Sequence, residues 1–552
     1  MLKVREHFPY AAEAEKHETD RLEAMGCIGE TITLSFSLES ADDISNLEIS
    51  ALPLAGSAGI IPPESIQVYV VHVWNQAGIG VYQSSSTLVS ELLLKDDRAP
   101  LLDKYKRQYR HWRHLFSPSY VYGAPDLRLV GPVRTSLKKG IPKQIWIIIK
   151  PPPECNTGFY QGQLAISCAQ KSIEDGGDTE KSITIKIELA PIKLTEPPQE
   201  RMLWYRGKLD WRDTQHFVCE DIFRAQLRDI FEHGFTSVSI SETDRTLAQR
   251  AIEIVEEVGF NRQIVFLPPF PGDPHTLIYK SVTPVLYLSD EIDSHLAYAE
   301  RNQDEHIMHH KVNWQRASDW KMKSMASLVS QTFANRFFDE ADIGHSPDIL
   351  SYSLAQNRDF VHINANLVHA RARHSYYYWH AYMEKPNLHR VLTGVYLWKS
   401  GFAGISPYCY QHLPKYPFSP FNDFDEWEPE FQVGILRKPF KDHMVTYPAA
   451  NGSIPTIQWE GFRDGIIDLR SLVTLESELA RARIAGDQHS EMVNSILRRR
   501  NDFLARMDLR LIKVNSETDP EPYADIEPRE YQAFRESNLR DILTIQQALA
   551  TT

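Results

Sequence analysis

Two adjacent carboxylates, Asp290 and Glu291, stand one residue after a short apolar run at residues 281–288. The run is rich in Val, Leu and Tyr and predicts a buried strand. In a parallel α/β fold, ligands bind where such strands end. Neighbouring carboxylates repel each other, so the more desolvated one stays protonated near neutral pH while the other stays ionised. Hydrolysis of a glycosidic bond needs such a pair of an acid and an anion. The alternative is structural: Asp290 caps a following helix and Glu291 lies in its first turn.

Aromatic residues recur at predicted strand ends in the same part of the chain. Sugar rings have an apolar C–H face that stacks on aromatic rings, so aromatic side chains near paired carboxylates favour a carbohydrate ligand. The predicted substrate-binding residues are Trp204, Tyr205, Trp379, Trp398, Tyr408 and Tyr410, with the carboxylate Glu242. Because side chains alternate along a strand, only some of these rings can face a pocket, and core packing accounts for about half of the aromatic residues.

A histidine cluster, His306, His309 and His310, raises the question of a metal. Imidazoles three apart in a helix share a face, but no further ligand is fixed nearby, and a polar surface loop explains the cluster. The five cysteines are scattered, odd in number and without CxxC spacing, so neither a disulfide framework nor a thiolate zinc site is indicated. The sequence predicts no metal and no cofactor.

The balance of charged residues indicates which classes of partner the protein can bind. The chain has 552 residues with 60 Lys and Arg against 73 Asp and Glu, a net charge of −13. That balance argues against nucleic acid or an anionic membrane as the main partner, and leaves a carbohydrate substrate and a homo-oligomer compatible with the sequence. No apolar run suits a signal peptide or a membrane span, so we expect a cytoplasmic protein.

The N-terminal part predicts a β-sandwich. Residues 1–29 are polar and predict a helical lead-in or a loose arm, and residues 30–196 form the sandwich domain. Alternating short strands are predicted at residues 32–38, 66–71, 144–150 and 182–189. Short strands with turn signals and no long helical pattern between them are typical of an antiparallel sandwich. Prolines 191, 197 and 198 mark the junction to the next domain.

Residues 197–485 predict a (β/α)8 barrel of the TIM type, because strand and helix patterns alternate over this range. Strands are predicted at residues 202–205, 236–240, 263–267, 281–288, 348–354, 374–380 and 404–410, and helices at 220–233, 246–258, 320–336 and 388–400. An open doubly wound sheet is the alternative, but no Gly-rich phosphate loop opens a helix. Residues 486–552 predict a helical C-terminal extension.

The stretch at residues 446–472 has a pattern of its own. Asn451 and Gly452 form a turn between two short strands. The helix that follows places acidic residues four apart, at Glu460, Asp464 and Asp468, with arginines beside them. Such spacing suits an ion-pair network better than catalysis.

Three segments of the chain resemble the glycoside hydrolase family 123 group: residues 446–472, the run that ends in Asp290-Glu291, and residues 394–405. The sandwich is similar as well, from residues 144–147 to 158–162. The resemblance covers about residues 30–485 and implies a sandwich followed by a (β/α)8 barrel. It also implies a β-N-acetylgalactosaminidase that retains configuration through the substrate's own 2-acetamido group.

The resemblance implies a role for each carboxylate. Asp290 would orient and stabilise the acetamido group as it attacks the anomeric carbon, and Glu291 would be the general acid and then the base. When the substrate supplies the nucleophile, two neighbours at one strand end suffice. Ile292 stands where the family commonly has proline. Two alternatives remain: a glycosidase that pairs Glu291 with another carboxylate such as Glu242, and a non-catalytic carbohydrate-binding protein.

Overall fold

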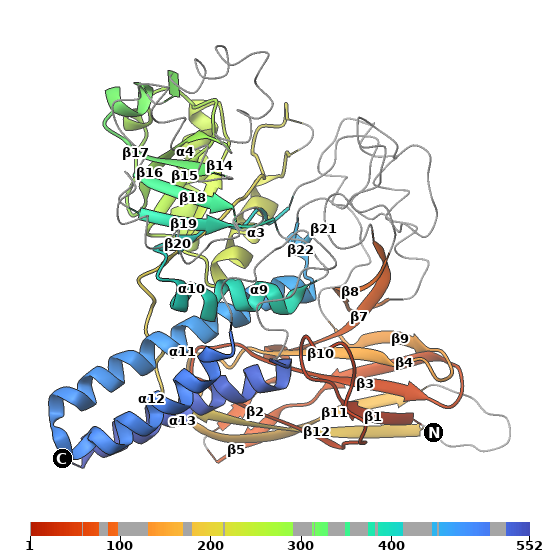
Figure 1. The fold of residues 1–552 in the computed structure, drawn as a ribbon. Coiled ribbons are helices and arrows are strands. Elements are labelled where there is room, and N and C mark those ends of the chain that lie inside the picture. Colours follow the sequence, from red (N-terminus) through yellow and green to blue (C-terminus); the bar gives the residue numbers. More distant parts are fainter. Residues whose placement is uncertain are drawn as a thin grey trace.

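The computed structural model places a β-sandwich, a closed barrel and a group of long helices side by side, with helix α11 (Ile457–Ala485) running between barrel and sandwich (Figure 1). The structure describes residues 2–57, 59–76, 87–97, 131–168, 179–213, 216–290, 312–313, 315–328, 348–353, 374–380, 385–411, 444–449, 452–507 and 526–551.

The sandwich consists of two sheets whose inner faces share one apolar core. The first sheet is ordered β1 (Leu2–Glu6), β3 (Ile32–Ser40), β10 (Lys143–Ile149), β7 (Ile66–Gln76) and β8 (Thr87–Leu94). The second is ordered β2 (Arg21–Cys27), β12 (Thr179–Ala190), β11 (Gly158–Cys168), β4 (Ile44–Ala51) and β9 (Val133–Leu137), with β5 (Leu54–Gly56) and β6 (Gly59–Ile61) beside β11. Among the described strands of the sandwich, the pairs are antiparallel except for parallel β2 and β12.

The prediction of a helical lead-in or loose arm at residues 1–29 is wrong. Strand β1 pairs with β3 and extends the first sheet, and β2 pairs with β12 and extends the second. The sequence does not reveal these strands, because both lie at sheet edges, where polar side chains stay partly or fully exposed. Val4 and Leu22 nevertheless reach the shared core.

The unbroken apolar sequence of strand β10 follows from its position in the sheet. Ile145 and Ile147 point into the sandwich core, while Trp146 and Ile148 join a second cluster on the outer face of the sheet. Ile457 at the start of α11 belongs to that outer cluster. The sheet is therefore buried on both faces, which requires apolar residues at every position.

The second domain is a closed barrel of eight parallel strands in sequential order, as expected from the alternation of strands and helices. The strands are β13 (Glu200–Leu203), β14 (Ser237–Ile240), β15 (Gln263–Phe266), β16 (Thr283–Ser289), β17 (Lys323–Leu328), β18 (Ile349–Ser353), β19 (His374–Tyr378) and β20 (Gly404–Ile405). The described connections contain α3 (Glu220–Glu232), α4 (Arg245–Val258), the short η2 (Pro274–Thr276), α9 (Pro386–Thr393) and α10 (Val395–Ser400).

Three predicted elements of the barrel differ from the structure. The helix predicted at 320–336 contains strand β17 instead, because pairing with β16 and β18 overrides local helical spacing. The helix at 388–400 is divided at Gly394, where a Cβ would lie 2.6 Å from the carbonyl oxygen of Gly465 in α11. The strand at 404–410 is assigned only at β20, although backbone hydrogen bonds to its neighbours continue as far as Tyr410.

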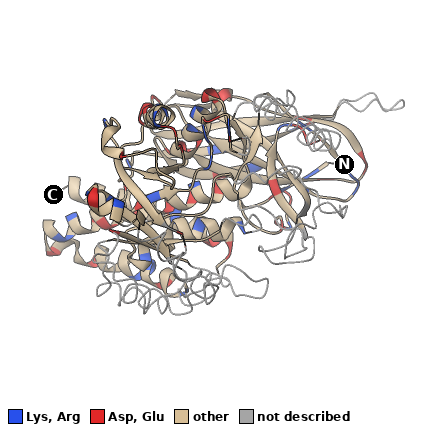
Figure 2. Ribbon diagram, turned by 90° about the horizontal axis from the view of Figure 1, so that it is seen from above, with Lys and Arg blue, Asp and Glu red and all other residues tan. Residues whose placement is uncertain are grey.

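The hairpin predicted around Asn451 is confirmed: β21 (Tyr447–Ala449) pairs with β22 (Gly452–Ile454). Helix α11 follows, and η5 (Asp487–His489), α12 (Ser490–Ala505) and α13 (Pro528–Ala550) form the C-terminal extension packed against it. In Figure 2, acidic and basic residues are interspersed along the described helices. No helix in the described ranges is both long and apolar enough to span a bilayer.

The acidic residues of α11 form the predicted ion-pair network, which is buried. Asp468 accepts two hydrogen bonds from Arg390 of α9, at 2.6 and 3.0 Å. Asp464 accepts hydrogen bonds from Tyr10 at 2.8 Å and Thr33 at 3.2 Å, and Glu460 pairs with Arg463. These contacts join α11 to both the barrel and the sandwich.

Candidate active site

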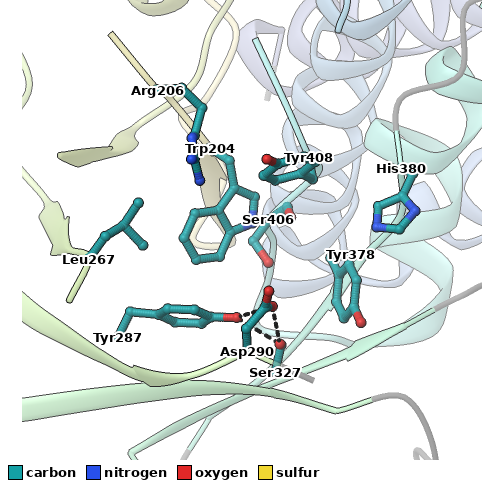
Figure 3. Close-up of a pocket in the computed structure, with 10 residues that line it drawn as sticks. All are labelled: Trp204, Arg206, Leu267, Tyr287, Asp290, Ser327, Tyr378, His380, Ser406 and Tyr408. Atoms are coloured by element: carbon teal, nitrogen blue, oxygen red, sulfur yellow. Dashed lines mark hydrogen bonds between the residues drawn. The ribbon is translucent and has the colours of Figure 1, made fainter. Parts of the chain in front are cut away.

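A cavity of about 300 Å³ opens at the carboxyl ends of the barrel strands. Figure 3 shows the side chains around it, which come from the ends of β13, β15, β16, β17, β19 and β20. The lining residues are Trp204, Arg206, Leu267, Tyr287, Asp290, Ser327, Tyr378, His380, Ser406 and Tyr408. This is the end of a parallel barrel at which ligands bind.

The alternation of side chains decides which of the predicted aromatic residues reach the cavity. Along β13 and the residues after it, Met202 and Trp204 point inward, whereas Leu203 and Tyr205 pack toward the outer helices. Trp204 stands edge-on to Tyr287, with ring centres 4.7 Å apart, and donates its indole N–H to the Ser406 carbonyl at 3.0 Å. The ring is thereby held in a fixed orientation at the cavity wall.

Asp290 follows β16 at the point where its pairing with β17 shifts register. Its Oδ1 accepts hydrogen bonds from the hydroxyl of Tyr287, at 2.7 Å, and from Ser327 of β17, at 3.1 Å. The two hydroxyls also contact each other at 2.7 Å. Asp290 remains exposed, and its Oδ2 has no hydrogen-bond partner among the described residues. Among the described residues, the carboxylate is therefore oriented through Oδ1 alone.

Burial keeps two of the neighbouring groups uncharged at neutral pH. Burial raises the pKa of Tyr287 well above its usual value, and the charge of Asp290 adds to this, so the hydroxyl stays a donor. Burial lowers the pKa of His380 to about 4, against the opposing effect of Asp290. His380 contacts the rings of Tyr378 and Tyr408, with centres 6.2 and 6.0 Å away. The cavity thus combines one oriented carboxylate with neutral aromatic walls.

Four predicted sugar-binding residues lie away from the cavity. Tyr205 and Tyr410 are buried on the outer side of the barrel wall, where they donate to Gln226 and Asp229. Trp379 is stacked on Phe462 of α11, and Trp398 in α10 donates its N–H to Glu476 of α11. Tyr205, Tyr410 and Trp379 thus pack strands against helices, and Trp398 packs one helix against another. Trp204 and Tyr408 are the two predicted aromatic residues that do line the cavity.

Glu242, the predicted carboxylate after β14, is also outside the cavity lining. Its side chain is 1% exposed, and its Oε1 accepts a hydrogen bond from the backbone N–H of Leu209 at 2.5 Å. Burial raises the pKa of Glu242, with the Leu209 N–H opposing the shift. The structure gives this residue the role of a tether for the loop that follows β13.

Several lining residues were not predicted from the sequence, although some left a signal. His380 lies two residues after Tyr378 and four after Tyr376, so the alternation of side chains along a strand places it on the same face as these two rings. Arg206 shares the parity of Trp204 in the same way. Ser327 could not be found, because its segment was predicted to be a helix.

Glu291 and the cluster His306, His309 and His310 lie outside the described residues. Within the described part of the chain, no three His, Cys, Asp or Glu side chains come together as a metal site would require. None of the five cysteines forms a disulfide in the described part of the chain.

No protein-family model matches the sequence, and no curated protein matches it. Among solved structures, the chain is similar to a family 123 glycoside hydrolase from Clostridium perfringens, with a TM-score of 0.58, 12% identity, and coverage of 99% of this chain and 98% of the other. A β-D-glucuronidase from Dictyoglomus thermophilum (TM-score 0.31, 7% identity, 84% and 97% coverage) and a xyloglucanase from Bacteroides ovatus (0.23, 9%, 84% and 99%) match too loosely to support an argument. The chain therefore shares its fold, over nearly its whole length, with a family 123 glycoside hydrolase.

Proposed function

We propose that this protein is a glycoside hydrolase that cleaves a β-linked 2-acetamido sugar, of the N-acetylgalactosamine type, with retention of configuration. The observation that carries the proposal is Asp290: an exposed carboxylate, held through one oxygen by two hydroxyls, at the carboxyl end of the barrel. The fold shared with an enzyme of glycolipid glycan hydrolysis supports this assignment, and it favours the (β/α)8 form of the barrel.

The cavity suits a single sugar ring. Its volume of about 300 Å³ is at the lower end of the range for small-molecule sites. Trp204, Tyr378 and Tyr408 offer aromatic surface for the C–H face of a pyranose, and Ser406 and His380 offer polar contacts for hydroxyl groups. A ring stacked in this way would bring its 2-substituent toward one wall, where Asp290 lies.

In the first step, the acetamido carbonyl oxygen attacks the anomeric carbon as the glycosidic C–O bond breaks. Asp290 Oδ2 accepts the acetamido N–H and stabilises the positive charge that develops on the cyclised group. Glu291 supplies a proton to the departing oxygen. In the second step, water attacks the anomeric carbon, its proton passes to Glu291, and the bond to the acetamido oxygen breaks, so configuration is retained.

The hydroxyls of Tyr287 and Ser327 act in this scheme as positioning groups. They occupy Oδ1 and fix the plane of the carboxylate before substrate binds, so less reorganisation is needed as charge develops. Tyr287 is itself fixed by its contact with Trp204, which would also touch the sugar. One set of contacts therefore couples sugar stacking to carboxylate orientation.

The test compares aryl β-glycosides that differ only at the 2-position. Turnover is expected for the 2-acetamido sugar, with tight inhibition by a thiazoline mimic of the cyclised intermediate, as for species close to a transition state. Glu291→Gln should abolish turnover of unactivated glycosides and leave the fold intact. A covalent adduct formed with a 2-fluoro sugar would instead indicate a carboxylate nucleophile and contradict the substrate-assisted route. Turnover of none of the glycosides would favour a carbohydrate-binding protein.

A further inference from the structure

The cavity contains a cation, Arg206, that differs from the other cations of its loop. Lys208 forms an ion pair with Asp213 at 2.9 Å, and Arg212 pairs with Asp210 at 2.7 Å. Arg206, half-buried in the cavity wall, has neither an ion-pair nor a hydrogen-bond partner among the described residues. In the view of Figure 3, the Trp204 ring lies between its guanidinium and Asp290, and the two charged groups form no ion pair.

Removing a guanidinium partly from water costs free energy, which an anion bound beside it would offset. The arginine guanidinium presents five N–H donors in a planar fork that matches the oxygens of a carboxylate or sulfate. His380, whose pKa is lowered to about 4 by burial, is uncharged at neutral pH. Arg206 is then the one positively charged side chain among the described residues that line the cavity.

The loop that carries Arg206 is held at defined points. Glu242 accepts the Leu209 N–H at 2.5 Å, and the backbone of Lys208 exchanges hydrogen bonds with His216 and Val218, at 2.9 and 2.8 Å. Because these tethers begin two residues after Arg206, its backbone is fixed relative to the barrel. A cation on such a base is preorganised for a ligand rather than left to solvent.

We infer that Arg206 forms a subsite for an anionic substituent, a sulfate or a carboxylate, carried by the sugar in the cavity or by its neighbour. This inference rests on the proposed function and deepens it, because it names a substrate class: acidic glycans rather than neutral ones. Asp290 and Arg206 then divide the recognition, with the carboxylate facing the acetamido group and the guanidinium facing the anion.

The first experiment measures equilibrium binding and does not depend on turnover. Isothermal titration compares the 4- and 6-sulfates of N-acetylgalactosamine, and glucuronate, with their neutral parent sugars. We expect an anionic member to bind about 10- to 100-fold more tightly than its parent, as charge-assisted hydrogen bonds allow. Preference for sulfates alone or for glucuronate alone identifies the anion. Equal binding of anionic and neutral sugars, or no binding of any anionic sugar, would overturn the inference.

Variants then assign the preference to Arg206. Arg206→Gln should bring the ratio of anionic to neutral affinity close to one, and Arg206→Lys should restore part of it, because lysine keeps the charge but loses the planar fork. Arg212→Gln is the matched control: it removes an arginine of the same loop that is already paired, and should leave the ratio unchanged. An equal loss of neutral and anionic binding in Arg206→Gln would make this residue a hydroxyl donor and contradict the subsite.

Kinetics separate this inference from the proposed function. If the wild type hydrolyses neutral and sulfated aryl 2-acetamido glycosides with equal kcat/KM and Arg206→Gln leaves that ratio unchanged, the anionic subsite fails while the hydrolase stands. If anionic sugars bind through Arg206 but no glycoside is turned over, the proposed hydrolysis fails while the subsite stands.

Discussion

Asp290 and Asp468 show two opposite ways in which this fold treats a carboxylate. Asp290 is exposed at the mouth of the barrel and receives hydrogen bonds from two neutral hydroxyls at a single oxygen. Asp468 is 4% exposed, and both of its oxygens accept hydrogen bonds from Arg390, which is itself 2% exposed. A carboxylate whose charge is already neutralised inside the protein is fixed in a structural role. One that is oriented but not neutralised can act on a ligand.

Histidines differ between the same two regions. His380 in the cavity lies beside aromatic rings, and burial lowers its pKa to about 4. His233 beneath α11 is also buried, but Asp229 and Glu460 lie 3.1 and 3.5 Å away, and they raise its pKa despite burial. The interior network compensates charge with charge, whereas the cavity leaves its groups neutral or open to a ligand.

The largest effect that we expect comes from breaking the interior pair. Arg390→Leu leaves Asp468 buried without its main partner, which should lower the free energy of unfolding by about 3–5 kcal/mol, measured by urea denaturation. The double variant Arg390→Leu/Asp468→Leu should recover part of this loss, because the uncompensated carboxylate is gone, although buried Arg535 then loses its ion-pair partner. A single variant as stable as the wild type would mean that Arg535, 3.9 Å from Asp468, suffices to compensate the charge.

In contrast to Arg390→Leu, the variant Asp290→Asn should lower activity strongly and stability very little. We expect kcat/KM on a 2-acetamido aryl glycoside to fall about 100- to 1000-fold, since the stabilising charge is lost while shape is kept. The free energy of unfolding should change by less than about 0.5 kcal/mol, as for other exposed positions. A large loss of stability with activity retained would place Asp290 in the same structural class as Asp468.

Tyr287→Phe removes one of the hydroxyls that orient Asp290 and keeps the ring that packs in the barrel. The net value of one hydrogen bond is about 1 kcal/mol, so kcat/KM should fall roughly fivefold. Ser327→Ala is the matched variant on the other hydroxyl and should cost a similar factor. If the loss in the double variant equals that of either single variant, the two hydroxyls act as one unit.

The two histidines should make contributions of opposite sign to the pH dependence of the free energy of unfolding. His233, with a raised pKa, stabilises the fold below about pH 6.5, and this contribution is lost as pH rises through its folded pKa. For His380, stability is lost as pH falls from about 6.5 to about 4, because the unfolded chain takes up the proton first. Each slope should reach at most about 1.4 kcal/mol per pH unit. His233→Asn should remove the loss of stability above pH 6.5, measured by urea denaturation across the pH range.

The order of domains could be predicted from local patterns. Period-two alternation predicted strands that correspond to β3, β7, β10 and β12, and alternating strand and helix patterns predicted a barrel of parallel strands. Both patterns arise from which faces of an element are buried, and that information is written into neighbouring residues. The same reasoning predicted that the acidic residues of α11 belong to an ion-pair network.

Long-range pairing could not be predicted in the same way. Strands β1 and β2 have polar edge sequences and exist only because β3 and β12 supply hydrogen bonds to them. Strand β17 was predicted as a helix, although pairing with its two neighbours makes it part of the barrel wall. Residues far apart in the sequence provide the partners, so local spacing carries no record of them.

For the site, the sequence by itself determined that a carboxylate pair follows a buried strand and that aromatic residues stand at other strand ends. Only the tertiary structure decided which of these side chains meet. Trp204 faces the cavity and Tyr205 does not, because consecutive residues of a strand point to opposite faces. Ser327 reaches Asp290 because barrel closure sets β17 beside β16, although 37 residues separate them in the chain.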